Sequence, residues 1–274
     1  MKKLHFISGL PRSGSTVLSA ILKQNPRFTA GISDPLADIS NSIIATINGA
    51  AGMTVQVPVN MQKEIIKGMF DTFYKNSNEV CFNTNRGWSS QTSLIKDLFP
   101  ASKIIICVRD IGWVLDSFEQ LNSKNPYTIK PIYHHQSLSS VYERTRMLMG
   151  EVPNYAGYVL SPLMNTKQSM YSNEKDMLCV VEYDKLVKQP KESMQQIYQF
   201  LNEPWYEHDF NNVEDSYDEF DDHAKIKGLH TVNKVVKYTQ RKPILPEDLW
   251  QLYSSLSFWK NDFDHIKKQI CWIG

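Results

Sequence analysis

Short runs of apolar residues alternate along the chain with longer segments in which apolar residues recur at helical spacing. The runs with the length of a buried strand cover residues 4–8, 28–32, 80–83, 103–108 and 177–183. Most of their apolar residues are consecutive rather than alternating, which is typical of parallel strands covered on both faces of a sheet. The pattern therefore predicts an α/β fold, with a parallel sheet built from βαβ units and flanked by helices.

The segments between these strands carry the stop signals of helices. Residues 15–24 end before Asn25-Pro26 and residues 89–98 end before Pro100, because proline does not continue a helix. Helices are also predicted over residues 111–121 and 190–201. Residues 245–273 are predicted to form two amphipathic helices, packed by their aromatic side chains on a single domain of residues 1–274. These aromatic residues are Trp250, Tyr253, Phe258, Trp259 and Trp272.

Composition excludes several classes of protein. The chain has 274 residues, of which 42% are hydrophobic and 22% charged, as in ordinary globular proteins. Its 30 basic and 29 acidic residues give a net charge of +1, so the total charge favours neither nucleic acid nor a membrane surface as partner. No apolar run reaches the ~18 residues of a transmembrane helix, and the first run is too short for the core of a signal peptide.

The cysteines do not form a metal-binding pattern. Cys81, Cys107 and Cys179 lie in strand-like runs, Cys271 stands alone, and none has CxxC spacing. Buried, reduced thiols that pack as small hydrophobic groups are expected instead. Reduced thiols suit a reducing compartment, so we expect a cytoplasmic protein.

Two charge-dense segments follow one another late in the chain. Residues 207–222 hold eight acidic side chains in sixteen positions, which predicts a solvated loop. Residues 225–242 are basic, and two interpretations stay open for them: solvated surface, or a loop that closes on an anionic ligand. Its basic residues are Lys225, Lys227, Lys234, Lys237, Arg241 and Lys242.

The residues after the first strand form the pattern of a phosphate-binding loop. Gly9 and Gly14 have the spacing of GxxxxGK[ST] and lie between a strand and a helix, as that motif requires. Backbone N–H groups of such a loop and the N-terminus of the helix attract an anion. Ser15 replaces the lysine that nucleotide triphosphatases need, and the loop carries Arg12 instead. The loop therefore suits a smaller anion than a triphosphate.

A second anion site is predicted after the strand at residues 103–108. Arg109 follows this strand directly, at the edge of the sheet where α/β proteins bind ligands. Ser117 lies eight residues further on, on the same general face of the next helix. An arginine and a hydroxyl suit a second phosphate, separate from the first. A structural salt bridge that ends the strand is the alternative.

Together these elements resemble the sulfotransferases that use 3′-phosphoadenosine-5′-phosphosulfate (PAPS), in particular bacterial enzymes akin to protein-tyrosine sulfotransferases. Residues 9–16 are similar to the loop for the 5′-phosphosulfate, and Arg109 with Ser117 to the 3′-phosphate site. Residues 181–190 and 228–232 resemble the segments that lie near the adenine and cover the phosphates. The cofactor-binding residues that the resemblance implies are Pro11, Arg12, Ser13, Gly14, Ser15, Thr16, Arg109, Ser117, Tyr183, His230 and Thr231.

The resemblance implies in-line transfer of a sulfuryl group from PAPS to an acceptor, which leaves 3′-phosphoadenosine-5′-phosphate (PAP). Arg12 would neutralise the leaving 5′-phosphate and Arg86 would assist, because charge develops there in the transition state. No metal is required. The tyrosylprotein enzymes have a catalytic glutamate at the position that falls on Ser33, beside Asp34. Their catalytic lysine maps onto residues 83–86, where Arg86 is the only cation.

The general base is left open between several residues. An acceptor hydroxyl needs a base near the sulfur, and Asp34 is the first candidate. Alternatively, Asp34 and Pro35 simply start the next helix as N-cap and first residue. His134 and His135 are further candidates, in a segment predicted to be a loop over the site.

Two other functions compete with sulfuryl transfer. A nucleotide or sugar kinase with a degenerate phosphate loop lacks its lysine and an evident metal-binding aspartate. A nucleotide-binding protein that has lost its catalytic activity would keep the fold and the nucleotide site but transfer no group. The sequence predicts a nucleotide cosubstrate and a hydroxyl acceptor, either a peptide tyrosine or a small molecule, and leaves a homodimer open as the oligomeric state.

Overall fold

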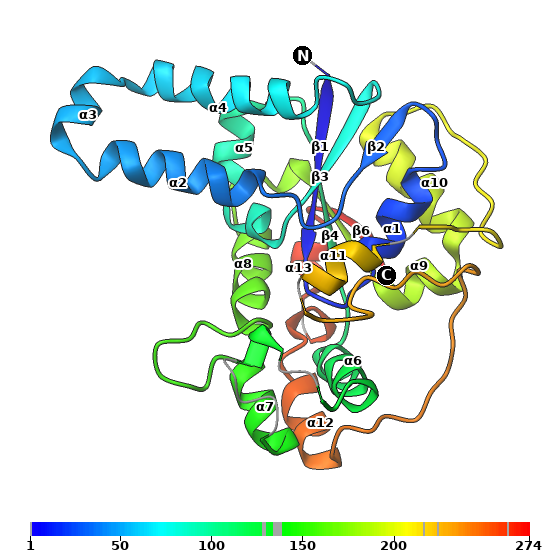
Figure 1. Cartoon of the computed structure of the whole chain (residues 1–274). Coiled ribbons are helices and arrows are strands. Elements are labelled where there is room, and N and C mark those ends of the chain that lie inside the picture. Colours follow the sequence, from blue (N-terminus) through cyan, green and yellow to red (C-terminus); the bar gives the residue numbers. More distant parts are fainter. Residues whose placement is uncertain (1, 128–129, 134–138, 216, 224, 262) are drawn as a thin grey trace.

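The computed structural model of the chain describes residues 2–127, 130–133, 139–215, 217–223, 225–261 and 263–274. Over these residues the chain forms a parallel sheet of six strands, in the order β2-β3-β1-β4-β5-β6 (Figure 1). The predicted α/β class is confirmed. The strands are β1 (Lys3–Gly9), β2 (Phe28–Ala30), β3 (Val80–Thr84), β4 (Ile104–Val108), β5 (Leu178–Glu182) and β6 (Cys271–Ile273).

The sixth strand corrects the prediction for the C-terminal segment. In place of two amphipathic helices the chain forms α12 (Glu247–Ser254), a 3-10 turn (Phe258–Lys260), the short α13 (Asp264–Lys267) and then β6. Trp272 lies in this strand. Three residues are too few to show a strand period in sequence, and β6 exists because it pairs with the distant β5.

Helices cover both faces of the sheet. The 3-10 turn Arg86–Ser90 and α5 (Thr92–Leu98) divide the predicted helix 89–98 between them. The segment between β2 and β3 contains α2 (Leu36–Asn48), α3 (Ala51–Gln56) and α4 (Val59–Phe73), whereas the sequence offered only a helix that starts near Asp34 and Pro35, as one of two interpretations. The remaining helices are α1 (Ser15–Leu22), α6 (Ile111–Lys124), α7 (Val141–Leu148), α8 (Leu160–Met170), α9 (Tyr183–Lys188), α10 (Pro190–Leu201) and α11 (Asp218–His223). Two further 3-10 turns span Pro131–Tyr133 and Lys175–Met177.

The two faces of the sheet have separate hydrophobic cores. Successive residues of β1 point to opposite faces, so Phe6 packs in one core and Ile7 in the other. The first core includes side chains of α4, α5, α6, α8 and α12, and the second those of α1, α9 and α10. In Figure 1, α2 and α4 run side by side and extend away from the sheet, joined at their far end by α3. No helix among the described residues is both long enough and apolar enough to cross a bilayer.

Parallel strands place their carboxyl ends at one edge of the sheet, and this edge positions the site. The chain segments that leave β1, β3, β4 and β5 there begin with Leu10, Asn85, Arg109 and Tyr183. β1 lies between β3 and β4, so the phosphate-loop sequence is flanked on both sides by other strand ends. Open α/β sheets bind their ligands at this kind of crevice.

Candidate active site

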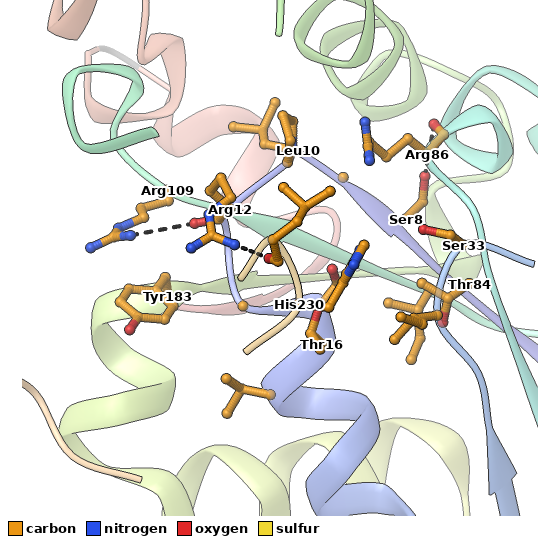
Figure 2. Close-up of a pocket in the computed structure, with 18 of the residues that line it drawn as sticks. Ser8, Leu10, Arg12, Thr16, Ser33, Thr84, Arg86, Arg109, Tyr183 and His230 are labelled. Carbon is orange, nitrogen blue, oxygen red and sulfur yellow. Dashed lines mark hydrogen bonds between the residues drawn. The ribbon is translucent and has the colours of Figure 1, made fainter. Parts of the chain in front are cut away.

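A cavity of about 420 Å³ opens at the carboxyl edge of the sheet. Its lining comes from every strand end just described, and Figure 2 shows most of it. Polar and charged side chains dominate this lining. They are Ser8, Arg12, Ser15, Thr16, Ser33, Asp38, Thr84, Asn85, Arg86, Arg109, Ser117, Tyr158, Tyr183, His230, Thr231 and Asn233.

The loop after β1 has the conformation of an anion-binding loop. Gly9 and Gly14 have φ angles of 114° and 95°, values that residues with a side chain rarely adopt. A Cβ on Gly9 would come 2.1 Å from the carbonyl oxygen of Cys107, so only glycine lets β1 and β4 approach here. The Ser13 hydroxyl donates to that carbonyl at 2.9 Å and to the Leu10 carbonyl, so this side chain builds the loop from beneath. Pro11, Ser15 and Thr16 line the cavity directly.

Among the described residues, no side chain caps the N-terminus of α1. Its first turn has no acidic residue, and Gly14 supplies no side-chain cap. The backbone N–H groups at the start of a helix need acceptors, and they favour negative charge. The loop therefore presents a row of donors to an anion in the cavity.

Three arginines have no carboxylate partner in the part of the chain that the structure describes, and all three line the cavity. They are Arg12, Arg86 and Arg109, and no described carboxylate lies within ion-pair distance of them. The other four, Arg27, Arg144, Arg146 and Arg241, each pair with an acid. All three are partly buried, and a partly buried cation without a counter-charge is costly, so this clustering is the electrostatic signature of an anion site.

Arg12 connects the two predicted phosphate sites. Its φ of 58° is left-handed, and its Nε donates to the Ser117 hydroxyl at 2.9 Å. Another of its nitrogens donates to the Leu229 carbonyl. Burial, reinforced by the neighbouring charge of Arg109, lowers the pKa of Arg12 to about 10. An anion bound between the two guanidinium groups would relieve this repulsion.

Arg109 faces the same space from the end of β4. Its guanidinium carbon lies 4.1 Å from the centre of the Tyr183 ring, and one terminal nitrogen donates to the Arg12 carbonyl at 3.4 Å. Its Nε is buried without a partner in the described structure, and burial lowers its pKa. The ring of Tyr183 also packs against Gly14, where a Cβ would come 2.8 Å from the ring, so the close approach requires glycine. A flat cationic and aromatic wall therefore adjoins the loop.

Arg86 forms the opposite side of the cavity. Its Nη2 donates to the Tyr158 hydroxyl at 2.7 Å, and its guanidinium lies 4.3 Å from the centre of the same ring. Its carbonyl accepts from the Ser8 hydroxyl at 3.1 Å, which ties the turn after β3 to β1. Tyr158 comes just before α8 and was not predicted as a site residue.

A buried histidine–aspartate pair corrects the prediction for the acidic segment. Asp221 lies on α11 and is 2% exposed, so residues 207–222 are not simply a solvated loop. Its carboxylate accepts from the His230 backbone N–H at 2.9 Å and contacts His230 Nδ1 at 2.6 Å. Burial lowers the pKa of His230 from its ordinary 6.5, although Asp221 opposes the shift. His230 is therefore held, uncharged at neutral pH, against the cavity that it lines.

The basic segment reaches the cavity through its uncharged residues. Thr231 and Asn233 line it, whereas no lysine of residues 225–242 is among the described lining. Lys234 pairs with Glu214, and Arg241 pairs with the buried carboxylate of Asp116. The segment lies over the site, but its positive charges are engaged elsewhere or exposed.

Asp34 turns toward the sheet and is not among the described residues that line the cavity. Its carboxylate accepts from the Thr84 backbone N–H at 2.7 Å, and its own N–H donates to the Thr84 carbonyl at 2.7 Å. Burial raises the pKa of Asp34 to about 6. The N-cap of α2 is Pro35, without a side-chain cap, so the alternative that Asp34 is the N-cap is wrong. Ser33 and Asp38 line the cavity instead. His134 and His135 lie outside the described residues.

The sequence prediction missed Tyr158, Asn85, Asn233 and Asp221. Asn85 follows β3 at the same edge as the predicted residues, so its position was a usable signal. The other three reach the site through contacts between distant parts of the chain, which no local pattern encodes.

A family model described as "Sulfotransferase family" matches residues 5–207 of the chain. A sulfotransferase from Alicyclobacillus acidocaldarius has a similar structure, with a TM-score of 0.58 at 11% identity over 98% of this chain and 96% of that one. A sulfotransferase domain from the curacin biosynthetic pathway gives a TM-score of 0.53 at 14% identity, over 98% of this chain and 97% of that one. At these identities the structural likeness shows the fold. No curated protein matches the chain.

Proposed function

The chain belongs to the sulfotransferase family, and from that membership we propose that it transfers a sulfuryl group from PAPS to an acceptor hydroxyl. One observation carries the choice of donor. The three arginines without a carboxylate surround a cavity that also contains the N-terminus of α1. A nucleotide with two separated anionic groups supplies the negative charge that these groups lack.

The chain offers a receptor for each anionic end of PAPS. The backbone N–H groups of residues 13–16 would hold the 5′-phosphosulfate, supported by the dipole of α1. Arg109 and Ser117 would hold the 3′-phosphate, because the unpartnered Nε of Arg109 is a free, buried donor. Tyr183 lies across the Arg109 guanidinium and would border the adenine. The residues present therefore fit this donor.

Bound PAPS supplies an activated sulfuryl group whose transfer leaves charge on the 5′-phosphate. Arg12 lies between the loop and Ser117 and would stabilise that charge, while Arg86 would approach the sulfuryl group from the Tyr158 side. The contact of Arg12 with the Leu229 carbonyl also draws the segment that carries His230 toward the loop. Arg12 would therefore both contact the cofactor and hold the segment that carries His230 over the site.

For the general base we propose His230 ahead of Asp34. The Asp221 carboxylate at Nδ1 favours the tautomer that carries its proton there, which leaves the Nε2 lone pair free to accept the acceptor's proton. The lowered pKa keeps the ring uncharged at neutral pH. The carboxylate of Asp34 is occupied by the backbone of β3 instead. Asp221 is a positioning residue in this scheme, since it acts through the histidine.

The donor is tested by binding and turnover together. PAP at about 100 times its dissociation constant should stabilise the protein by ~2.7 kcal/mol, and AMP at the same concentration should stabilise it less. Radiolabelled PAPS with a panel of phenols, sugars and aliphatic alcohols should give a sulfated product without magnesium. Equal binding of PAP and AMP would overturn the 3′-phosphate site. Phosphoryl transfer from ATP that needs magnesium would instead indicate a kinase, and PAP binding without turnover on any acceptor would indicate a binding protein.

A further inference from the structure

Two cysteines on neighbouring strands face each other outside the active site. Cys179 of β5 and Cys271 of β6 are directly opposite in the parallel register. Their sulfur atoms are 3.1 Å apart, and both residues are free thiols. Sulfuryl transfer as proposed uses neither of them.

The backbone geometry at this pair suits a disulfide bond. Paired strands are separated by about 4.7–4.9 Å, which lies within the Cα–Cα range of about 4.4–6.8 Å that disulfides occupy. Residues opposite each other in a parallel register point to the same face, and both side chains pack against the same hydrophobic core. Small side-chain adjustments are therefore sufficient to bring the two sulfur atoms to bonding distance.

The two thiols differ in a way that suits stepwise oxidation. Cys179 is fully buried, and burial raises its pKa. Cys271 is partly exposed on an edge strand, and the hydrogen bond from Cys179 lowers its pKa. Thiolate character and access together decide which cysteine reacts first. Cys271 is thus the attacking thiol and Cys179 the resolving one.

We propose that Cys179 and Cys271 form a redox-active dithiol, which a low-molecular-weight disulfide such as oxidised glutathione converts into a disulfide between β5 and β6. The Cys271 thiolate attacks one sulfur of the oxidant, forms a mixed disulfide and releases one glutathione thiolate, which takes up a proton. Cys179 then loses its proton, attacks the Cys271 sulfur and displaces the second glutathione. Two protein thiols and one oxidised glutathione become one protein disulfide and two reduced glutathione molecules.

The disulfide would fasten a weakly held part of the fold. β6 has three residues and is paired only with β5 among the described strands. Trp272 Nε1 donates to Glu182 Oε1 at 3.1 Å, and Glu182 immediately precedes Tyr183. A covalent bond one residue before Trp272 would therefore stabilise the strand that ends at the cofactor-binding edge. The closed loop joins residues 92 positions apart, so the melting temperature should rise on the order of 10 °C.

The experiment oxidises the reduced, full-length chain with excess glutathione disulfide and does not depend on sulfotransferase activity. The expected product has lost two hydrogens in intact mass and two of its four thiols in a denatured thiol assay. Peptide mapping should link Cys179 to Cys271, and dithiothreitol should reverse both the link and the rise in melting temperature.

Two variants serve as controls. Cys271→Ser should prevent the internal disulfide, whereas Cys81→Ser should form it normally, because Cys81 lies on β3, which β1 and β4 separate from β5 and β6. The reduced Cys271→Ser protein should melt within a few degrees of the reduced parent, which shows that β6 still forms. A persistent glutathione adduct on Cys271, a link to Cys107, or no loss of thiols would each overturn the proposal.

Discussion

The loop after β1 and the covering segment, residues 217–223 and 225–233, meet at one cavity but are held in place in opposite ways. The loop is fixed by its neighbours in the sheet, since Gly9 and Ser13 both contact Cys107 of β4. The covering segment depends on side-chain contacts: Asp221 with His230, and Arg12 with the Leu229 carbonyl. The first arrangement would give a preformed anion site. The second would give a covering segment in which the proposed base, His230, is held in place by only a few contacts.

This difference separates two kinds of residue in one site. Groups attached to the sheet edge, such as Arg109, should mainly determine how tightly the nucleotide binds. Groups brought in by the covering segment, such as His230, should mainly determine turnover. Arg12 belongs to the loop but contacts the covering segment, so it should affect both.

The largest effect on turnover is expected from His230, on the covering segment. His230→Gln should lower turnover by ~10²–10⁴-fold, the usual range for loss of a general base, and leave the dissociation constant of PAP nearly unchanged. The matched control is His223→Gln on α11, an exposed histidine whose Nδ1 contacts the Glu219 carbonyl and which is not among the described residues that line the cavity. Steady-state kinetics and PAP titration on the same preparation check this. If PAP binding weakened in parallel with turnover, His230 would be a phosphate ligand instead of a base.

Arg12→Ala should lower turnover by ~10²-fold or more, because it removes a donor at the leaving 5′-phosphate. PAP binding should weaken as well, since the guanidinium also lies beside Ser117. The melting temperature should change little, because Gly9, Ser13 and Gly14 hold the loop without this side chain. Arg146→Ala, an exposed arginine paired with Glu151, is the control. Normal turnover in Arg12→Ala would contradict the proposed 5′-phosphosulfate site around Arg12.

Arg109→Ala should weaken PAP binding by about 10–100-fold, as expected for loss of a charge-assisted contact, with a much smaller change in turnover at saturating PAPS. Its proposed contact is with the 3′-phosphate, which is present in the ground state and in the transition state alike. The comparison of PAP with AMP sharpens the test, because Arg109→Ala should abolish the preference for PAP. A variant that binds PAP normally but turns over slowly would reverse the assignment.

Asp221→Asn should lower turnover less than His230→Gln does. The amide cannot carry the negative charge that favours the Nδ1–H tautomer and opposes the lowered pKa of His230. The acid limb of the turnover–pH profile should therefore shift to lower pH, since the ring loses a neighbour that raises its pKa. An unchanged profile would mean that Asp221 only supports the fold.

The smallest effect on turnover is expected from Asp34→Asn, within about threefold, because the carboxylate contacts β3 and is not among the described residues that line the cavity. Its effect is on stability. Burial raises the pKa of Asp34 to about 6, above its ordinary 3.8, so the folded protein binds this proton more tightly than the unfolded one. The free energy of unfolding should fall as pH rises from about 4 to 6, and Asp34→Asn should flatten this slope in melting curves. A large loss of turnover would restore Asp34 as the base.

The sequence by itself determined the parts of this protein that are encoded in contiguous residues. Consecutive apolar runs predicted five parallel strands, and the spacing of Gly9 and Gly14 after the first predicted the anion loop. Arg109 could be placed at the ligand-binding edge because it follows a strand that is buried on both faces. A strand period, a glycine conformation and a strand end are local properties, so a short stretch of chain is enough to specify them.

Only the tertiary structure decided which groups act together. The left-handed conformation of Arg12 turns its guanidinium to Ser117, 105 positions away. In the sequence, Asp221 is one of eight acidic residues in positions 207–222. In the structure it is buried because α11 packs beside His230. β6 forms a strand because it pairs with β5, and this pairing places Cys271 opposite Cys179. Each of these contacts joins distant segments, and the free energy that fixes them comes from burial and pairing in the folded chain.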